Sequence, residues 1–313
     1  MHSEYREEYV MMNGMKQYLL HYPQENKPIL LVLHGGPGGA EHLLAHYLNP
    51  YFKEVVTQVQ WDQRGAGKTW LKNKSADGPQ SIEQMVDDLH AVVKHLQEVY
   101  QMQKIILLGH SFGSILGSLY ALQYPENVLA YIGSGQVVNM MENERESYLL
   151  ALKTTKERGN QKQIQMLEKL KGYPPKDKKL LMKQLPKVRQ LSPRNPEELS
   201  AGEQIRIALK SPCFHLSDIT SFLKANKVNR KLLYDVLDFD LRSYAKQYKV
   251  PMYYISGEFD YTTPSHITQK YFEEIQAPQK SCVVMAGAGH NMMYEQPKEY
   301  ARLLKEIVQD LRL

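Results

Sequence analysis

The sequence predicts an α/β fold in which helices flank a mainly parallel, eight-stranded sheet, with a helical cap inserted into it. Short apolar runs alternate with segments of helical periodicity, as in proteins whose parallel sheet is covered on both faces. The alternation stops between residues 137 and 240, where the chain is helix-like and interrupted by prolines. We therefore expect a core formed by residues 1–136 and 241–313 and a cap formed by residues 137–240.

Two antiparallel strands should open the fold. Asn13 and Gly14 separate two runs of alternating apolar residues, and both tolerate the positive φ that a type I′ turn requires. After Pro28, residues 29–33 form a continuous apolar run of the kind that a strand buried on both faces needs. Five further runs have the same character: residues 55–61, 105–108, 129–132, 252–255 and 282–285.

The clearest helix signal covers residues 81–100. Ser81 and Gln84 suit a capping box, and apolar residues recur at helical spacing as far as Leu96. The segment that interrupts the alternation contains no convincing buried strand. We therefore interpret it as an insertion between two strands of the sheet.

Charge is unevenly distributed along a chain whose formal net charge is only +5. Residues 151–190 contain twelve Lys or Arg against three acidic residues. The simplest interpretation is a solvated helical face, and the alternative is a patch that attracts acidic partners or a membrane surface. No aromatic-interleaved pattern of a nucleic-acid module accompanies it, so we expect no nucleic-acid partner.

The N-terminal segment is polar and lacks the apolar core of a signal peptide, and no apolar run approaches the ~20 residues of a membrane span. We therefore expect a cytoplasmic protein with no membrane partner. Cys213 and Cys282 show no metal-ligand or redox spacing, so neither a disulfide framework nor a bound metal is expected. The sequence leaves the oligomeric state open.

The strongest local signal is Gly-His-Ser-Phe-Gly at residues 109–113, which fits the pattern G-x-S-x-G. It follows an apolar strand and precedes the helix-compatible residues 114–123, which is the context that a nucleophile elbow requires. The flanking glycines let neighbouring backbone approach without Cβ clashes. We predict that Ser111 is a catalytic nucleophile and not merely part of a tight turn.

A serine hydroxyl is a weak nucleophile at neutral pH, so it needs a base, and the base needs an orienting acid. In the α/β-hydrolase fold these residues follow in the order Ser, acid, His, each after a later strand. Here a strand and a glycine turn precede Asp260, and the next strand and a glycine loop precede His290. We predict Asp260 as the orienting acid and His290 as the base, with Glu258 as the alternative acid.

Acyl transfer also places negative charge on the carbonyl oxygen, which backbone N–H groups stabilise in an oxyanion hole. The residue after the nucleophile, Phe112, should supply one N–H group. The second should come from the glycine-rich residues 34–39, which directly follow the first buried parallel strand. We choose Gly36 for this role, with Gly35 as the alternative.

Residues 61–64, Trp-Asp-Gln-Arg, follow another predicted strand. We assign them to the structure beneath the site and not to catalysis. Arg64 can pair with Asp62 or with a neighbouring acid.

Taken together, these motifs resemble the proline iminopeptidase family of α/β-hydrolases. The combination of H-G-G-P-G with D-Q-R-G is more specific than either motif alone, and the similarity covers residues 5–136 and 250–311. The motifs that carry it are the Ser111 elbow and residues 34–39, 61–67, 257–260 and 287–290. The cap shows no evident resemblance.

The resemblance implies an aminopeptidase that releases N-terminal proline or another small residue from short peptides, without a metal or organic cofactor. It also implies that acidic residues of the cap hold the free amino group of the substrate. Glu203 is our preferred residue for this role. The available candidates are Glu142, Glu144, Glu146, Glu197, Glu198 and Glu203.

Two features depart from the family pattern: the cap is strongly basic, and the elbow carries His110 and Phe112 where the family often has Gly and an aromatic Trp or Tyr. A small-molecule carboxylesterase, lactonase or amidase with the same triad therefore remains an alternative. A binding protein that has lost catalysis is a third hypothesis, against which the intact set of residues argues. Dehalogenases and epoxide hydrolases use Asp at the elbow, so Ser111 disfavours both.

Overall fold

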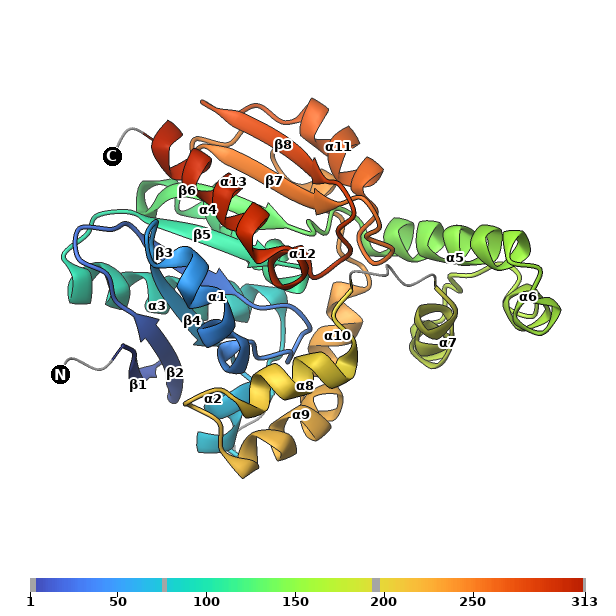
Figure 1. Ribbon diagram of the computed structural model, residues 1–313, viewed down its shortest axis with the longest axis horizontal. Helices are drawn as coiled ribbons and strands as arrows, with labels where there is room; N and C mark the ends of the chain where they lie inside the picture. The colour runs from blue at the N-terminus through green and yellow to red at the C-terminus, as the bar shows by residue number, and fades with distance from the viewer. Residues whose placement is uncertain (1–3, 75–77, 193–197, 312–313) are drawn as a thin grey trace.

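The computed structural model describes residues 4–74, 78–192 and 198–311 (Figure 1). Its strands form one eight-stranded sheet in the order β1-β2-β4-β3-β5-β6-β7-β8. The pairs β1–β2 and β2–β4 are antiparallel and all the others are parallel, which confirms the expected sheet. The strands are β1 (Arg6–Met12), β2 (Met15–Tyr22), β3 (Ile29–Leu33), β4 (Thr57–Asp62), β5 (Ile105–His110), β6 (Val128–Ser134), β7 (Met252–Gly257) and β8 (Lys280–Met285).

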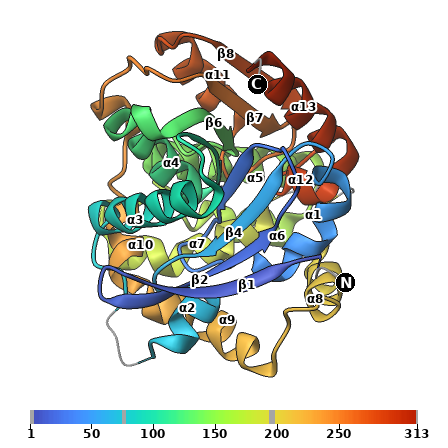
Figure 2. The same ribbon diagram turned by 90° about the vertical axis from the view of Figure 1, so that its left-hand side faces the viewer.

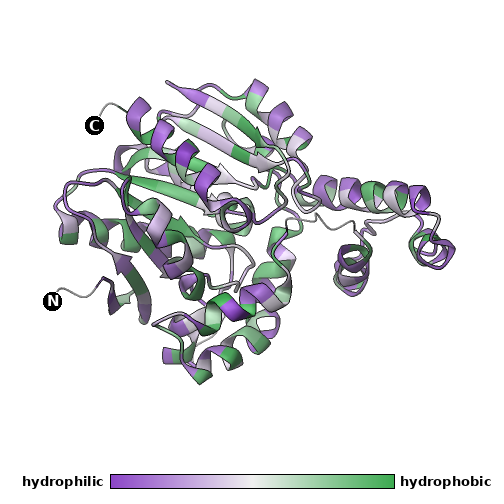
Figure 3. Ribbon diagram, in the orientation of Figure 1, coloured by the Kyte–Doolittle hydropathy of each residue, from purple (hydrophilic) through white to green (hydrophobic). Residues whose placement is uncertain are grey.

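The sheet is twisted, with β1 at one edge and β8 at the other (Figure 2). The expected turn joins β1 to β2, since Asn13 and Gly14 both have positive φ, of 48° and 78°. The central strand β3 is buried along its whole length. Hydrophobic residues concentrate in the central strands, whereas the helices around them carry many hydrophilic residues (Figure 3).

Two helical layers cover the sheet. The helices α3 (Ile82–Tyr100), α4 (Phe112–Gln123) and α11 (Ser265–Glu274) share one hydrophobic cluster with alternate strand residues such as Leu31 and Leu107. The residues between them, such as Leu30 and Ile106, belong to a second cluster on the other face. That second cluster contains side chains of α1 (Ala45–Phe52), α12 (Met292–Glu295) and α13 (Pro297–Asp310).

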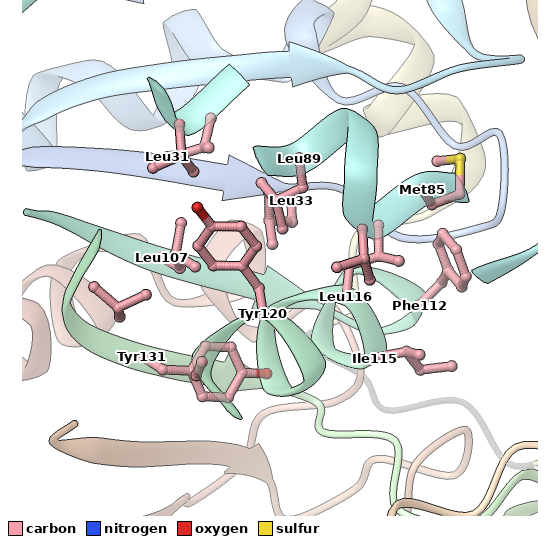
Figure 4. Packing of buried hydrophobic residues seen from close by; sticks show 14 of the residues in the cluster. Leu31, Leu33, Met85, Leu89, Leu107, Phe112, Ile115, Leu116, Tyr120 and Tyr131 are labelled. Carbon is pink, nitrogen blue, oxygen red and sulfur yellow. The ribbon is translucent and has the colours of Figure 1, made fainter. Parts of the chain in front are cut away.

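Figure 4 shows the first cluster from close by. Tyr120 and Leu116 of α4 lie over Leu33 and Leu107 of the sheet. Because consecutive residues of a strand point to opposite faces, a strand covered on both sides needs a continuous apolar sequence. This requirement explains why the buried strands can be recognised from short apolar runs.

The segment between β6 and β7 is helical. The helices are α5 (Met140–Glu157), α6 (Gln161–Glu168), α7 (Lys178–Leu191), α8 (Ala201–Leu209), α9 (Leu216–Val228) and α10 (Arg230–Val236). In Figure 1 the first three helices project from the body as an arm. Of the other three, α9 contacts α2 (Gly67–Lys72), α8 contacts the 3₁₀ helix η1 (His42–Leu44), and α10 contacts α3 and α9. The arm has its own hydrophobic cluster, and the division into core and cap at residues 137 and 241 stays a prediction. The other short helices are η2 (Pro125–Asn127) and η3 (Leu241–Ser243).

None of the helices in the described part of the chain is both long and apolar enough to span a bilayer.

Replacing Gly117 with Ala should lower the free energy of unfolding by about 2 kcal/mol, because overpacking a filled core displaces its neighbours. A Cβ at Gly117 of α4 would lie 2.3 Å from the ring of the buried Tyr131. Gly202→Ala is the matched control, since a Cβ there meets only Ser200 Oγ at 3.9 Å. It should raise stability by about 0.5 kcal/mol. Urea unfolding measures both, and equal effects would contradict the packing argument.

Candidate active site

Ser111 lies at the sharp turn between β5 and α4. Its backbone has φ 51° and ψ −119°, a conformation that is strained for a residue with a Cβ. The turn requires glycine two residues before and two residues after Ser111, at Gly109 and Gly113. A Cβ at Gly113 would lie 1.9 Å from the Leu33 carbonyl oxygen, and a Cβ at Gly109 would lie 2.7 Å from the Gly113 oxygen. The glycines of the motif therefore allow α4 to approach β3 and β5.

Asp260 and His290 form a hydrogen-bonded pair. The loop after β7 carries Asp260 and the loop after β8 carries His290, and the distance between His290 Nδ1 and Asp260 Oδ2 is 2.9 Å. The other carboxylate oxygen accepts hydrogen bonds from the backbone N–H groups of Thr262 and Thr263, both at 2.8 Å. The hydroxyl of Thr263 donates to Asp260 Oδ2 at 2.7 Å.

The buried carboxyl group of Asp260 is held in its ionised form. Burial alone would raise the pKa of Asp260, but the attraction of His290 and the hydrogen bonds from Thr263 hold it below its ordinary value. The alternative acid, Glu258, is exposed and accepts a hydrogen bond from Gly287 N–H at 2.9 Å. Of the two acids, the structure pairs Asp260 with His290.

The three predicted catalytic residues lie at the carboxyl ends of β5, β7 and β8, on one edge of the sheet. Gly135, which follows β6 with φ 59°, leaves room between these loops, since a Cβ there would lie 3.2 Å from His290 Cε1 and 3.3 Å from Asp260 Oδ2. Within the described residues, no hydrogen bond joins Ser111 Oγ to His290. Catalytic hydrogen bonds are often absent or long until substrate binds.

The predicted oxyanion loop lies against the elbow. A Cβ at Gly35 would be 3.2 Å from Ser111 Cβ. Gly36 has φ 120°, and a Cβ there would lie 2.6 Å from the nitrogens of Gly38 and Gly39. Phe112 is the first residue of α4, where backbone N–H groups have no partner within the helix.

Sequence reasoning missed a buried pair beneath the elbow. His110 Nδ1 lies 2.8 Å from Glu41 Oε1, and His110 Nε2 lies 3.2 Å from the carbonyl oxygen of His290. The same Glu41 oxygen accepts a hydrogen bond from Gly35 N–H at 3.3 Å. The partners are 69 residues apart in the chain, so no local pattern connects them.

A cleft of about 350 Å³ opens beside His290. Its walls include Arg189 at the end of α7, Glu198 and Gln204 near α8, and Tyr261 of the Asp260 loop. The Arg189 guanidinium pairs with a carboxylate that is fully buried, that of Glu144, and donates to the Tyr261 carbonyl oxygen at 3.3 Å. The cleft therefore presents charges of both signs beside the histidine.

The structure gives Glu203 a local role. Its carboxylate accepts hydrogen bonds from Ser200 N–H at 2.8 Å and from Ser200 Oγ at 2.7 Å, which completes a capping box at the start of α8. The other acidic candidates are placed differently: Glu142 pairs with Arg242, Glu144 with Arg189, Glu146 lies near His266, Glu198 lines the cleft, and Glu197 lies outside the described residues. Glu198 is thus the acidic candidate found at the cleft within the described chain.

Among the residues that the structure describes, no three His, Cys, Asp or Glu side chains are gathered as a metal site would require.

Comparisons with known proteins agree with the geometry of the elbow and the sheet. A family model described as "Serine aminopeptidase, S33" matches residues 11–207. The probable aminopeptidase YbaC of Bacillus subtilis is 27% identical over 303 residues, covering 93% of this chain and 92% of the relative. A proline iminopeptidase of Saccharolobus solfataricus is 22% identical over 306 residues, covering 93% and 88% of the two chains.

Solved structures share the fold. A proline iminopeptidase-related protein from Thermus thermophilus superimposes with a TM-score of 0.69 at 20% identity, covering 99% of each chain. Other proteins with this fold are described as an esterase, a putative lipase and an epoxide hydrolase. At such low identity these structures establish the α/β-hydrolase fold and leave the substrate open.

Ser111→Ala should abolish labelling by a fluorophosphonate, because the probe reacts with an activated serine hydroxyl. Ser192→Ala is the matched control, since Ser192 also lines the cleft beside His290. Gel fluorescence of the two variants and the wild type measures the labelling, and circular dichroism checks the fold. Labelling that persists in Ser111→Ala would place the reactive nucleophile elsewhere.

Proposed function

The chain belongs to the serine aminopeptidase S33 family of α/β-hydrolases and is a serine hydrolase, and on this premise we propose that Ser111, His290 and Asp260 form its catalytic triad. The observation that carries the proposal is the strained serine at the strand-to-helix turn together with a buried Asp260–His290 pair on the same edge of the sheet. Strain of this kind persists where function requires it.

In the proposed reaction, Ser111 Oγ attacks the carbonyl carbon of the substrate. His290 Nε2 takes the serine proton and later donates it to the leaving group. The ionised Asp260 accepts the His290 Nδ1–H bond, which leaves Nε2 free to act as the base and stabilises the imidazolium. Water then attacks the acyl-enzyme, with His290 again taking the proton.

The backbone N–H groups of Phe112 and Gly36 serve as the oxyanion hole. Each such donor lowers the barrier by about 3 kcal/mol where it is already oriented toward the developing charge. The close contact between Gly35 and Ser111 supports this role, because it brings the loop of Gly36 next to the reacting carbonyl.

The substrate class that we propose is a short peptide with a free N-terminus, from which the enzyme releases proline or another small residue. Glu198 at the cleft supports this class, because a carboxylate attracts a protonated amine. The half-buried Glu295 lies nearby: burial raises the pKa of its carboxyl group, and the charge of Glu198 adds to that effect. A cation placed between the two carboxylates would relieve their repulsion. The relatives named probable aminopeptidase and proline iminopeptidase support the same substrate class.

The second candidate is a small-molecule carboxylesterase, lactonase or amidase that uses the same triad. Arg189 favours it, because its guanidinium lies in the cleft near His290, where a peptidase selective for amines would be expected to present acids. Glu203, which the sequence suggested as the amine anchor, has its carboxylate engaged at Ser200. Neither candidate requires a cofactor.

A comparison of a prolyl arylamide, an alanyl arylamide and a short acyl ester discriminates between the two candidates. We expect kcat/KM to be higher for the aminoacyl arylamides relative to an arylamide whose amino group is acetylated, by at least about tenfold if a charged amine is recognised. Ester cleavage without turnover of any aminoacyl arylamide would rule out the peptidase.

Glu198→Gln should raise KM for aminoacyl substrates by about tenfold and spare the ester, because only the aminoacyl substrates carry the amine. Glu203→Gln is the matched control and should leave both KM values unchanged, while loosening the capping box of α8. Steady-state kinetics of both variants measure KM for the aminoacyl substrates and for the ester. An effect of Glu203→Gln confined to aminoacyl substrates would restore Glu203 as the anchor.

A further inference from the structure

Glu41 and His110 form an ion pair beneath the nucleophile elbow, apart from the triad itself. Glu41 precedes η1, and His110 is the last residue of β5, directly before Ser111. Their exposed fractions are 8% and 3%, so both are removed from bulk water. A buried charge requires a partner and a full set of hydrogen bonds.

The positions of the hydrogen-bond partners favour a charged pair. His110 Nδ1 faces a carboxylate oxygen, and His110 Nε2 faces the carbonyl oxygen of His290. A neutral imidazole has only one N–H, so donation from both nitrogens requires the imidazolium form. Glu41 in turn accepts bonds from Gly35 N–H at 3.3 Å and from the Tyr294 hydroxyl at 3.0 Å, as an ionised carboxylate does.

The electrostatic balance agrees with this assignment. Burial alone would lower the pKa of His110, but the Glu41 carboxylate and the His290 carbonyl raise it above its ordinary value. Burial would likewise raise the pKa of Glu41, but His110 and the hydrogen bond from Gly35 hold it below the ordinary value. Both shifts favour the charged forms of the two groups.

The pair joins the parts of the proposed site that must act together. Glu41 holds the backbone of Gly35, next to the proposed oxyanion donor Gly36. His110 holds the carbonyl oxygen of His290 and is covalently joined to Ser111. Because a misplacement of about 1 Å at a reacting group lowers rates by up to about 100-fold, a link between these segments affects the reaction directly.

We propose that Glu41 and His110 are positioning residues whose ion pair fixes the oxyanion loop and the His290 loop against Ser111. This inference rests on the proposed triad. The family resemblance does not account for it, since the family often has glycine where this chain has His110. The pair would act on the rate of acyl transfer whether the substrate is a peptide or an ester.

Removal of the Glu41 charge should change how kcat depends on pH if Glu41 and His110 position the site. In Glu41→Gln, the carboxylate that raises the pKa of His110 is gone, whereas burial still lowers it. His110 therefore loses its proton at a lower pH in the variant than in the wild type. One of its two donor bonds is then lost, and kcat should fall along an added limb that the wild type lacks. Four further titratable groups face the pair: His34, Asp260, His290 and Tyr294. All four are also present in the variant.

Kinetics of Glu41→Gln on a p-nitrophenyl ester should show kcat reduced by about 10-fold to 100-fold, with KM changed less than about twofold. Glu41→Asp, which keeps the charge, should recover the wild-type shape of the pH profile. The matched control is His42→Gln, which breaks the equally buried His42–Asp62 pair at 2.9 Å. It should destabilise the protein without adding a limb to the profile.

A folded Glu41→Gln variant with the kcat and pH profile of the wild type would overturn the proposal. Because the variant can fail to fold, the wild-type protein provides a second test. Nitrogen-15 NMR of the His110 ring, assigned by comparison with His110→Gln, should show two ring protons from about pH 6 to about pH 8. A neutral His110 at about pH 7 would also overturn the proposal. Absence of turnover of both the ester and the aminoacyl arylamides in the wild type would instead count against the proposed function, because the NMR result does not depend on activity.

Discussion

Close packing of α4 against β3 determines the geometry on which the site depends. The helix can start at Phe112 only because Gly113 has no Cβ beside the Leu33 carbonyl oxygen. Ser111 stands at the turn that this contact permits, directly before the first turn of α4, where backbone N–H groups lack partners within the helix. The proposed nucleophile and the packing of α4 on the sheet thus share one steric condition, which is independent of the substrate.

Buried carboxylates at the carboxyl edge of the sheet are each matched with an imidazole. Asp260 pairs with His290, Glu41 with His110 and Asp62 with His42, at distances of 2.8 to 2.9 Å. Such pairing removes the unfavourable free energy of isolated charges while keeping polar groups in the interior. Of the three pairs, Asp260–His290 and Glu41–His110 adjoin the segments that carry the proposed site, whereas the His42–Asp62 pair lies at the end of β4 and is assigned to structure.

Local patterns in the sequence were sufficient to predict the sheet, because strand burial and glycine turns depend on neighbouring residues. Ser111, Asp260 and His290 follow β5, β7 and β8 in the expected order, and their catalytic role stays a prediction. Contacts between distant segments were not predictable. Arg64, for example, pairs with Asp88 at 2.6 Å and not with Asp62. Glu203 illustrates a different point: Ser200 and Glu203 have the spacing of a capping box, a local signal that the search for an amine anchor overlooked and that the structure forms. Its role as an amine anchor stays a prediction.

The strained backbone of Ser111 lowers the stability of the fold at a residue whose hydroxyl group the proposed reaction requires. A residue held at φ 51° costs about 1 to 3 kcal/mol, which the surrounding packing must offset. Glycine at this position would relieve the cost but would remove the hydroxyl of the proposed nucleophile, so a substitution that favours stability would abolish the proposed reaction. On the proposed role of Ser111, the residue that the reaction needs is therefore one that the stability of the fold alone would not favour.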